Sequence, residues 1–177
     1  MRIFSCSSII PLKRVNLIGE AVVKLSFPVK WIHIGGGKQL ESIKKKFLNS
    51  PKNITICFTG QVNNKEVRKY FVDKPADLFI NVSITEGVPI SIMEAMSAGI
   101  PVFATDVGGT SEIVNSENGK LLPADLTPEY LAEQISNFYT YSDNIKFEFR
   151  KKAYNKFQEM CNGKLLAEQF ADFLKTL

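Results

Sequence analysis

The chain has 177 residues, of which 45% are hydrophobic and 23% are charged, and its formal net charge is +4. These values are typical of one soluble folded domain, and they exclude a disordered, collagen-like or coiled-coil protein. A charge of +4 is too small to indicate nucleic acid as a partner. No apolar run reaches the roughly 18 residues of a membrane-spanning helix, and the first residues lack the apolar core of a signal peptide.

The cysteines and the histidine limit the chemistry further. Cys6, Cys57 and Cys161 are odd in number, far apart and without metal-ligand spacing. They fit free thiols in a reducing cytoplasm, which is the expected location. The single histidine, His33, excludes a His-rich metal site and argues against a self-contained Ser–His–Asp triad.

Short β-rich runs alternate with helical patterns along the chain. In chain order, the pattern predicts a strand over 2–7, a helix over 14–25, a strand over 29–34, a helix over 38–48, a strand over 54–58, a helix over 65–72, a strand over 78–82, a helix from Pro89 to Gly99, a strand over 101–105, a short helix from Gly108-Gly109 to Val114, a strand over 120–122, a helix over 127–139, and two helices between 144 and 177. Thr127 is the expected N-cap of its helix, and Gly99 is the expected left-handed cap.

This alternation predicts the fold class. Repeated strand–helix units indicate an α/β, Rossmann-like three-layer domain, in which helices cover both faces of a parallel sheet of about six strands. Ligands bind such sheets beyond the carboxyl ends of the strands. The residues that follow each strand are therefore the informative ones.

Several of these strand ends are rich in glycine or in positive charge. Gly35-Gly36-Gly37 follows one strand, and Lys13 and Arg14 follow the first strand. Glycine lets backbone N–H groups approach an anion closely, and a helix N-terminus favours negative charge, so the set suits a phosphate. The alternative is that the glycines simply make tight turns. They match neither Gly-x-Gly-x-x-Gly nor the phosphate loop with its Gly-Lys-Ser/Thr ending.

Two carboxylates are expected to flank one crevice. The helix over 90–98 is apolar nearly all round, which predicts burial, and Ser91, Glu94 and Ser97 form its one narrow polar stripe. Glu86 precedes this helix in a loop at the end of a strand. In the structural alternative, Glu94 bonds a backbone group and Glu86 caps the helix N-terminus. The residues alone leave these two interpretations evenly balanced.

The segment from Glu86 to Glu94 resembles the Glu-x7-Glu motif of the retaining GT-B glycosyltransferases, particularly of their family four. A lone Glu-x7-Glu is a weak signal, but other segments resemble the same family in the same order. These segments are 5–15 with its Pro-x-Lys turn, 34–37, 59–62 and 99–114. The ordered series, which runs between Ile3 and Tyr139, is specific.

The resemblance covers only the C-terminal, donor-binding half of a GT-B enzyme. It implies that residues 1–177 form a single nucleotide-sugar-binding domain, that the N-terminal acceptor domain is absent, and that the isolated chain is inactive. The implied full-length protein is a hexosyltransferase-like enzyme of polysaccharide biosynthesis. It transfers a sugar from a nucleotide-diphosphate sugar to a glycan or a lipid-linked acceptor. The family needs no cofactor and no metal, because basic side chains and a helix dipole take the place of a cation.

The resemblance also implies roles for individual residues. Lys13 and Glu86 are the implied catalytic residues. Lys13 pairs with the diphosphate and with the charge that develops on the leaving group, and Glu86 lies near the donor sugar. Glu94 hydrogen-bonds the ribose hydroxyls. The other implied substrate-binding residues are Gly87 and Val88 through their N–H groups, Gln61 and Val62 beside the base, Gly36 and Arg14.

Two positions depart from the family pattern. Many relatives carry Gly-Arg where this chain has Ser7-Ser8, so one phosphate cation is missing and Arg14 is the expected substitute. Many also carry Glu-Gly-Phe-Gly where this chain has Glu86-Gly87-Val88-Pro89, and a proline lacks the N–H donor. Both departures concern how the diphosphate is held, not the fold.

Other functions remain as alternatives at this stage. One is a non-catalytic nucleotide-binding or interaction module, because a fold does not determine a function. Another is a GT-B epimerase or phosphorylase, although no lysine-centred motif supports the pyridoxal cofactor of a phosphorylase. Retention of Lys13, Glu86 and Glu94 favours the transferase. The Lys-rich runs 44–46 and 146–156 are interpreted as solvated helix faces, with peripheral contact to the inner face of a membrane as the alternative.

Overall fold

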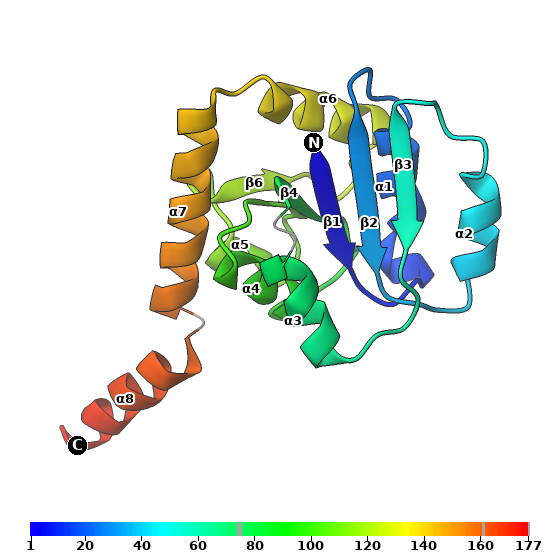
Figure 1. Cartoon of the computed structure of the whole chain (residues 1–177). Helices are drawn as coiled ribbons and strands as arrows, with labels where there is room; N and C mark the ends of the chain where they lie inside the picture. The colour runs from blue at the N-terminus through cyan, green and yellow to red at the C-terminus, as the bar shows by residue number, and fades with distance from the viewer. Residues whose placement is uncertain (74–75, 161, 177) are drawn as a thin grey trace.

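The computed structural model describes residues 1–73, 76–160 and 162–176, and one parallel sheet forms its centre (Figure 1). In the described part of the chain the sheet has six strands in the order β3-β2-β1-β4-β5-β6. The strands are β1 (Arg2–Cys6), β2 (Val29–Ile34), β3 (Ile54–Phe58), β4 (Leu78–Asn81), β5 (Val102–Thr105) and β6 (Gly119–Leu122). The predicted fold class is therefore confirmed.

Helices follow the strands in alternation, as the sequence predicts. They are η1 (Pro11–Lys13, a 3-10 helix), α1 (Val15–Val22), α2 (Leu40–Lys46), α3 (Asn64–Asp73), α4 (Ile90–Ser97), α5 (Thr110–Ile113), α6 (Pro128–Tyr139), α7 (Asp143–Met160) and α8 (Gly163–Leu174). The side chain of Thr127 accepts a hydrogen bond from the Tyr130 amide, so its predicted capping of α6 is confirmed. Gly99 lies just beyond α4 with a left-handed φ of 65°, also as predicted.

The two faces of the sheet are covered by different helices (Figure 1). One buried cluster joins the sheet to α1, α2 and α6. A second cluster joins the opposite face to α3, α4, α5 and α7. Neighbouring residues of one strand serve opposite clusters, as Ile3 and Phe4 do, because side chains alternate across a strand. Both faces are thus buried, which explains why every residue of β4 and of β5 is buried.

The order of the strands determines where a ligand can enter. β1 pairs with β2 on one side and with β4 on the other, so the chain progresses in opposite directions from this point. The loops that follow β1 and β4 therefore diverge and leave a crevice at the carboxyl ends of these two strands. The loop after β1 carries Lys13, and the loop after β4 carries Glu86.

The last helix, α8, lies apart from the sheet. Figure 1 shows α8 running away from the sheet, beyond the end of α7. Among the described residues, none of the helices combines the length and the apolar character that crossing a membrane requires. Cys6 and Cys57 are free thiols, as expected. Cys161 lies outside the described residues.

Candidate functional site

A cleft of about 420 Å³ opens at the crevice between the loops after β1 and β4. Four of the residues predicted from the sequence line it, namely Lys13, Glu86, Val88 and Glu94. Residues that the sequence analysis did not assign line it as well: Cys6, Ser7, Ser8, Asn64, Val67, Pro89, Ile90 and Ser91. The structure thus brings together both predicted carboxylates and the predicted catalytic lysine.

A larger pocket, of about 550 Å³, lies elsewhere, between α1, α2 and the start of α6. None of the predicted site residues lines it. Its charged side chains pair with each other, as in the ion pair between Lys24 and Glu129 and that between Lys46 and Glu20. The smaller cleft at the strand ends, where charges and loops converge, is therefore the better candidate site.

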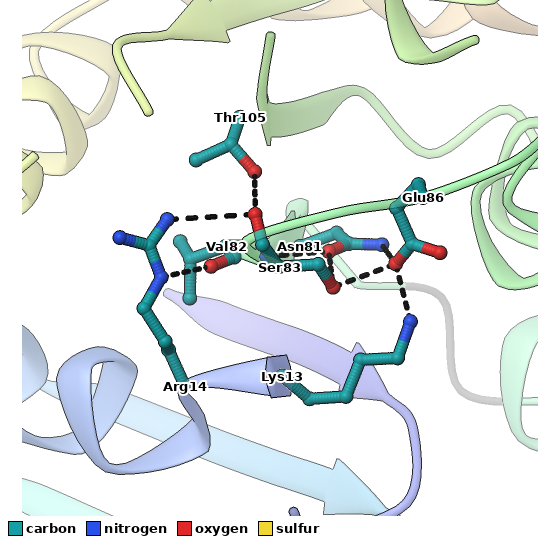
Figure 2. Close-up of polar contacts among 7 residues, drawn as sticks. All are labelled: Lys13, Arg14, Asn81, Val82, Ser83, Glu86 and Thr105. Atoms are coloured by element: carbon teal, nitrogen blue, oxygen red, sulfur yellow. Dashed lines mark hydrogen bonds and ion pairs between the residues drawn. The ribbon is translucent and has the colours of Figure 1, made fainter. Parts of the chain in front are cut away.

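Lys13 and Glu86 form an ion pair at the wall of the cleft (Figure 2). The Lys13 Nζ atom lies 2.6 Å from Glu86 Oε1, and the two side chains are only 24% and 11% exposed. Lys13 reaches this position because η1 ends there and the next residue turns the backbone with a left-handed φ of 45°. A short charged contact between half-buried groups is stronger than an ordinary surface ion pair.

The Glu86 carboxylate accepts two further hydrogen bonds on the same oxygen. Asn81 Nδ2 lies 3.0 Å and Ser83 Oγ 2.6 Å from Glu86 Oε1. Burial alone would raise the pKa of Glu86, but the donors Lys13, Ser83 and Asn81 outweigh it and hold the pKa below its usual 4.5. Glu86 is therefore ionised at neutral pH. None of the described residues donates to its other oxygen, Oε2.

Glu94 lies in the middle of α4, and its side chain is 17% exposed. Burial raises the pKa of Glu94, and Arg68, whose Nε atom lies 3.6 Å away, opposes this rise only in part. Cys6, which also lines the cleft, has a pKa raised to about 12 by burial and by Glu94, so the thiol is protonated. Among the described residues the Glu94 carboxylate bonds no backbone group.

The structural alternative for these two carboxylates is therefore not found. α4 begins after Pro89 without a side-chain cap, and Glu86 pairs with Lys13 instead of capping it. One expectation about this helix is wrong, however. Ile90 is 67% exposed, and Met93 is only half-buried, so α4 is not buried all round. The reason is that the first turn of α4 forms part of the open cleft.

The loop before α4 presents backbone donors. Within the described residues, the N–H groups of Gly87 and Val88 have no hydrogen-bond acceptor. The loop after β5 is hydrogen-bonded to this segment, since the Gly109 amide donates to the Gly87 carbonyl at 2.9 Å. Gly108 approaches so closely that a Cβ there would lie 1.8 Å from the Glu86 carbonyl oxygen. Only glycine can occupy this position, which also has a left-handed φ of 54°.

The other predicted residues do not themselves line the cleft, although Gly87 lies between two residues that do, Glu86 and Val88. Gly36 lies against Gln61, since a Cβ on Gly36 would meet the Gln61 nitrogen at 3.0 Å. Val62 lines a separate pocket of about 270 Å³ beside α3. Gly36, Gln61 and Gly87 are not among the residues lining the cleft. Their assigned contacts with the base and the phosphates stay predictions.

Arg14, the expected phosphate cation, has other contacts in the structure. Its guanidinium does not line the cleft and instead donates to the backbone carbonyls of Val82 at 2.6 Å and Ser83 at 3.5 Å (Figure 2). It also donates to the Ala124 carbonyl at 2.7 Å. The physical reason is the left-handed turn at Arg14, after which the side chains of Lys13 and Arg14 diverge. The contacts of Arg14 thus do not support its expected use as a phosphate cation.

His33, to which the sequence analysis gave no role, is fully buried in β2. Its Nε2 atom lies 3.1 Å from the Ser7 carbonyl, which can only accept, so Nε2 carries the proton. Nδ1 then accepts from the Ser5 hydroxyl at 2.9 Å, and that hydroxyl accepts from Trp31 Nε1 at 2.9 Å. Burial lowers the pKa of His33 to about 4. This buried chain fixes Ser7 at the edge of the cleft.

Comparisons with known proteins agree with this geometry. The family model of the glycosyl transferases group 1 matches residues 2–159. The O-antigen biosynthesis glycosyltransferase WbnH of Escherichia coli is 31% identical over 166 residues, which are 93% of this chain and 43% of WbnH. The chain spans less than half the length of the first curated relatives that it matches.

Solved structures share the fold. The Anabaena protein HepE, crystallised with UDP and glucose, superposes with a TM-score of 0.80 at 20% identity, over 99% of this chain and 48% of HepE. The C-terminal domain of LpcC, a glycosyl transferase group 1 protein of Francisella tularensis, superposes with a TM-score of 0.77 at 19% identity. That match covers 90% of this chain and 85% of the LpcC chain. The GT-B glycosyltransferase fold is thereby confirmed.

Proposed function

The chain belongs to the glycosyl transferases group 1 family, and we propose that it is the donor-binding domain of a retaining glycosyltransferase. The enzyme transfers a sugar from a nucleotide-diphosphate sugar to a glycan or a lipid-linked acceptor of polysaccharide biosynthesis. The observation that carries the proposal is the meeting of Lys13, Glu86 and Glu94 in one cleft. The retaining stereochemistry follows from the resemblance of the Glu86–Glu94 segment.

In this proposal Lys13 binds the diphosphate. A lysine ammonium has three donors, so Lys13 can keep its hydrogen bond to Glu86 and offer two others to phosphate oxygens. The N–H groups of Gly87 and Val88, which have no acceptor among the described residues, add neutral donors at the start of α4. As the bond to the sugar breaks, negative charge grows on the leaving phosphate, and these donors stabilise it. No metal or other cofactor is proposed.

Glu86 holds the donor sugar. Its Oε1 atom accepts from Lys13, Asn81 and Ser83, which fixes the carboxylate in place. Oε2 has no donor among the described residues, and it can accept from a sugar hydroxyl. The lowered pKa keeps this acceptor ionised at neutral pH. A fixed, charged acceptor orients the sugar without reorganising during the reaction.

Glu94 binds the ribose. Its carboxylate lies on the cleft side of α4, and its one close partner among the described residues is the exposed Arg68. Two ribose hydroxyls can donate to one carboxylate, which has two accepting oxygens. Because HepE was crystallised with UDP, UDP is the first nucleotide to test.

A second domain completes the site in this proposal. Four large aliphatic side chains on the segments that form the cleft are exposed, namely Leu12 at 47%, Ile84 at 52%, Val88 at 51% and Ile90 at 67%, and the last two line the cleft itself. A cluster of exposed aliphatic groups at the rim of a site is typical of a surface that a partner covers. The relatives are more than twice as long as this chain, which leaves room for an acceptor-binding domain. A lipid-linked acceptor would bring the enzyme to a membrane surface.

The substitution Lys13→Ala tests the proposal. We expect it to weaken UDP binding by about 1.5–3 kcal/mol, the usual contribution of a hydrogen bond to a charged group. Uridine, which lacks the phosphates, should bind both proteins almost equally. Isothermal titration calorimetry of UDP and uridine gives the comparison, and Lys45→Ala, which removes an exposed positive charge on α2, is the control. Equal losses for UDP and uridine would show that Lys13 does not meet the phosphates.

A further inference from the structure

Lys13 and Arg14 are neighbours in sequence, but they hold the loop after β4 from two different sides (Figure 2). Lys13 contacts Glu86 at the cleft end of this loop. Arg14 donates to the carbonyls of Val82 and Ser83 where the loop leaves the sheet. It also donates to Ala124, in the loop after β6, so one guanidinium joins three segments of the chain.

The backbone at Arg14 is costly to maintain. Arg14 is the one residue other than glycine with a positive φ among the described residues. A left-handed conformation costs a side chain with a Cβ on the order of 1 kcal/mol relative to glycine. Glycine would make this turn without that cost, but it could not donate to the carbonyls. Such strain persists where surrounding contacts require it, and here the contacts are those of the guanidinium.

The segment that Arg14 contacts also contacts Glu86. Ser83 follows Val82, and its hydroxyl lies 2.6 Å from Glu86 Oε1. The Ser83 carbonyl that Arg14 contacts also accepts from Thr105 Oγ1 at 2.6 Å. The next residue, Ile84, donates its amide to the Leu12 carbonyl at 2.8 Å, which ties the same loop to η1. The loop that carries Glu86 is thus held at its base before it reaches the cleft.

We propose that Arg14 is a positioning residue, which acts through Val82 and Ser83 to place Glu86 opposite Lys13 and does not itself contact the donor. This inference rests on the proposed function only in its last step, where the placed pair binds a nucleotide sugar. Without the guanidinium, the Val82–Ser83 segment keeps only the side-chain contacts of Thr105 and Asn81 with Ser83, and Val82 loses its contact with Arg14. The hydrogen bonds from the Ser83 hydroxyl and the Lys13 ammonium to Glu86 are then formed for a smaller fraction of the time.

A titration of Glu86 measures this placement without any ligand. The glutamate carboxyl carbons are labelled with 13C, the Glu86 resonance is identified with Glu86→Gln, and its pKa is measured by NMR. Arg14→Lys is the main variant, because it retains the positive charge, so a change reports geometry and not a lost attraction. Arg14→Gly removes the side chain and relieves the strained turn. Arg150→Lys is the matched control, since Arg150 also donates to a carbonyl, that of Ala76, which precedes β4, whereas Glu86 follows it.

We expect the pKa of Glu86 to rise toward its usual 4.5 in both Arg14 variants and to keep its wild-type value in Arg150→Lys. UDP affinity should fall between about tenfold and a hundredfold in Arg14→Lys, the usual effect of losing one hydrogen bond to a charged group. If Arg14→Gly does not fold, the pKa of Glu86 in Arg14→Lys alone tests the inference.

An unchanged pKa of Glu86 in a folded Arg14→Lys protein would overturn the inference. If UDP affinity fell in that same protein, Arg14 would be a direct phosphate contact. Failure of the wild-type chain to bind UDP would instead count against the proposed function, and the titration of Glu86 would still give its answer.

Discussion

The Glu86 carboxylate is fixed in position by the side chains of neighbouring residues. Three donors converge on one of its oxygens, and their effect on the pKa exceeds that of burial. Two of the three, Asn81 and Ser83, were not predicted as site residues. The signal was present in the sequence, because a polar residue ends the apolar strand Leu78–Asn81 and another follows two positions later. What the sequence could not give is the direction of their side chains.

The contacts of Arg14 were not predicted, for a related reason. A cation beside Lys13, after a strand, is reasonably expected to face an anion. The left-handed φ of 45° at Arg14 sends its side chain to the carbonyls of Val82 and Ala124 instead. Nothing in the sequence indicates a left-handed conformation at an arginine, because glycine and asparagine are the residues that usually adopt it.

The substitution Glu94→Gln separates binding from stability. Burial raises the pKa of Glu94, so the ionised carboxylate is less favourable there than in water, and an amide should leave the melting temperature unchanged or slightly higher. Nucleotide affinity should fall by about 1.5–3 kcal/mol, because the amide has one accepting oxygen where the carboxylate has two. Thermal melts with and without UDP measure both effects. Glu133→Gln, on the exposed face of α6, is the control.

A large drop in the melting temperature of Glu94→Gln without ligand, with UDP affinity unchanged, would assign Glu94 to structure and not to the ribose.

His33 makes the stability of the chain depend on pH. Its pKa is about 4 in the folded protein, against 6.5 for a free side chain, because burial disfavours the imidazolium. A lowered pKa means that the stabilisation is complete above pH 6.5 and is lost as the pH falls toward 4. At pH 5 the loss should reach about 2 kcal/mol. Urea denaturation at pH 7 and at pH 5 gives this difference.

The chain has one histidine, so His33→Gln should remove most of the pH dependence between 7 and 5 while lowering the stability at both values. A wild-type free energy of unfolding that stays constant over this range would contradict the burial of a neutral His33.

At the scale of elements, the sequence predicted strands more accurately than helices. The ranges of β2 and β3 agree with the prediction to the residue. α1 ends three residues before the predicted Leu25, and η1 was not predicted. Apolar spacing locates a helix that packs on a sheet, but it does not show which face stays open. That is why Ile90, an apolar residue at the cleft, was wrongly expected to be buried.

The loop between β5 and α5 supports the loop that carries Glu86, and Gly108→Ala tests this contact. A Cβ at Gly108 would lie 1.8 Å from the Glu86 carbonyl oxygen, so the backbone at Glu86 must move. We expect UDP affinity to fall at least about tenfold, as for other small displacements in a site. Gly99→Ala is the matched control, because Gly99 has a similar φ of 65°, but a Cβ there would meet its nearest atom at 3.3 Å.

Both glycine variants should lose about 1–2 kcal/mol of stability to the left-handed conformation, measured by urea denaturation. If Gly99→Ala weakens UDP binding as much as Gly108→Ala does, the effect comes from strain in general and not from the position of Glu86.

At the scale of the whole molecule, the alternation of elements was sufficient to predict the fold. Six strands separated by helices, together with the right-handed crossover of parallel strands, leave few arrangements. The reversal of strand order between β1 and β4 then locates the cleft. The exposure of Leu12, Ile84, Val88 and Ile90 was not predictable, because an apolar residue in a sequence is expected to be buried within its own domain. The sequence showed only that the chain resembles one half of a larger enzyme.

The central claim is that this chain holds the donor and depends on a second domain for transfer. The direct measurement adds UDP, and then a panel of UDP-sugars, to the 177-residue chain, with calorimetry for binding and a product assay for transfer. We predict that UDP binds and that no sugar is transferred, because a single domain cannot close over the donor and exclude water. Rapid sugar transfer by the chain alone would contradict the account, and so would a chain that binds no nucleoside diphosphate at all.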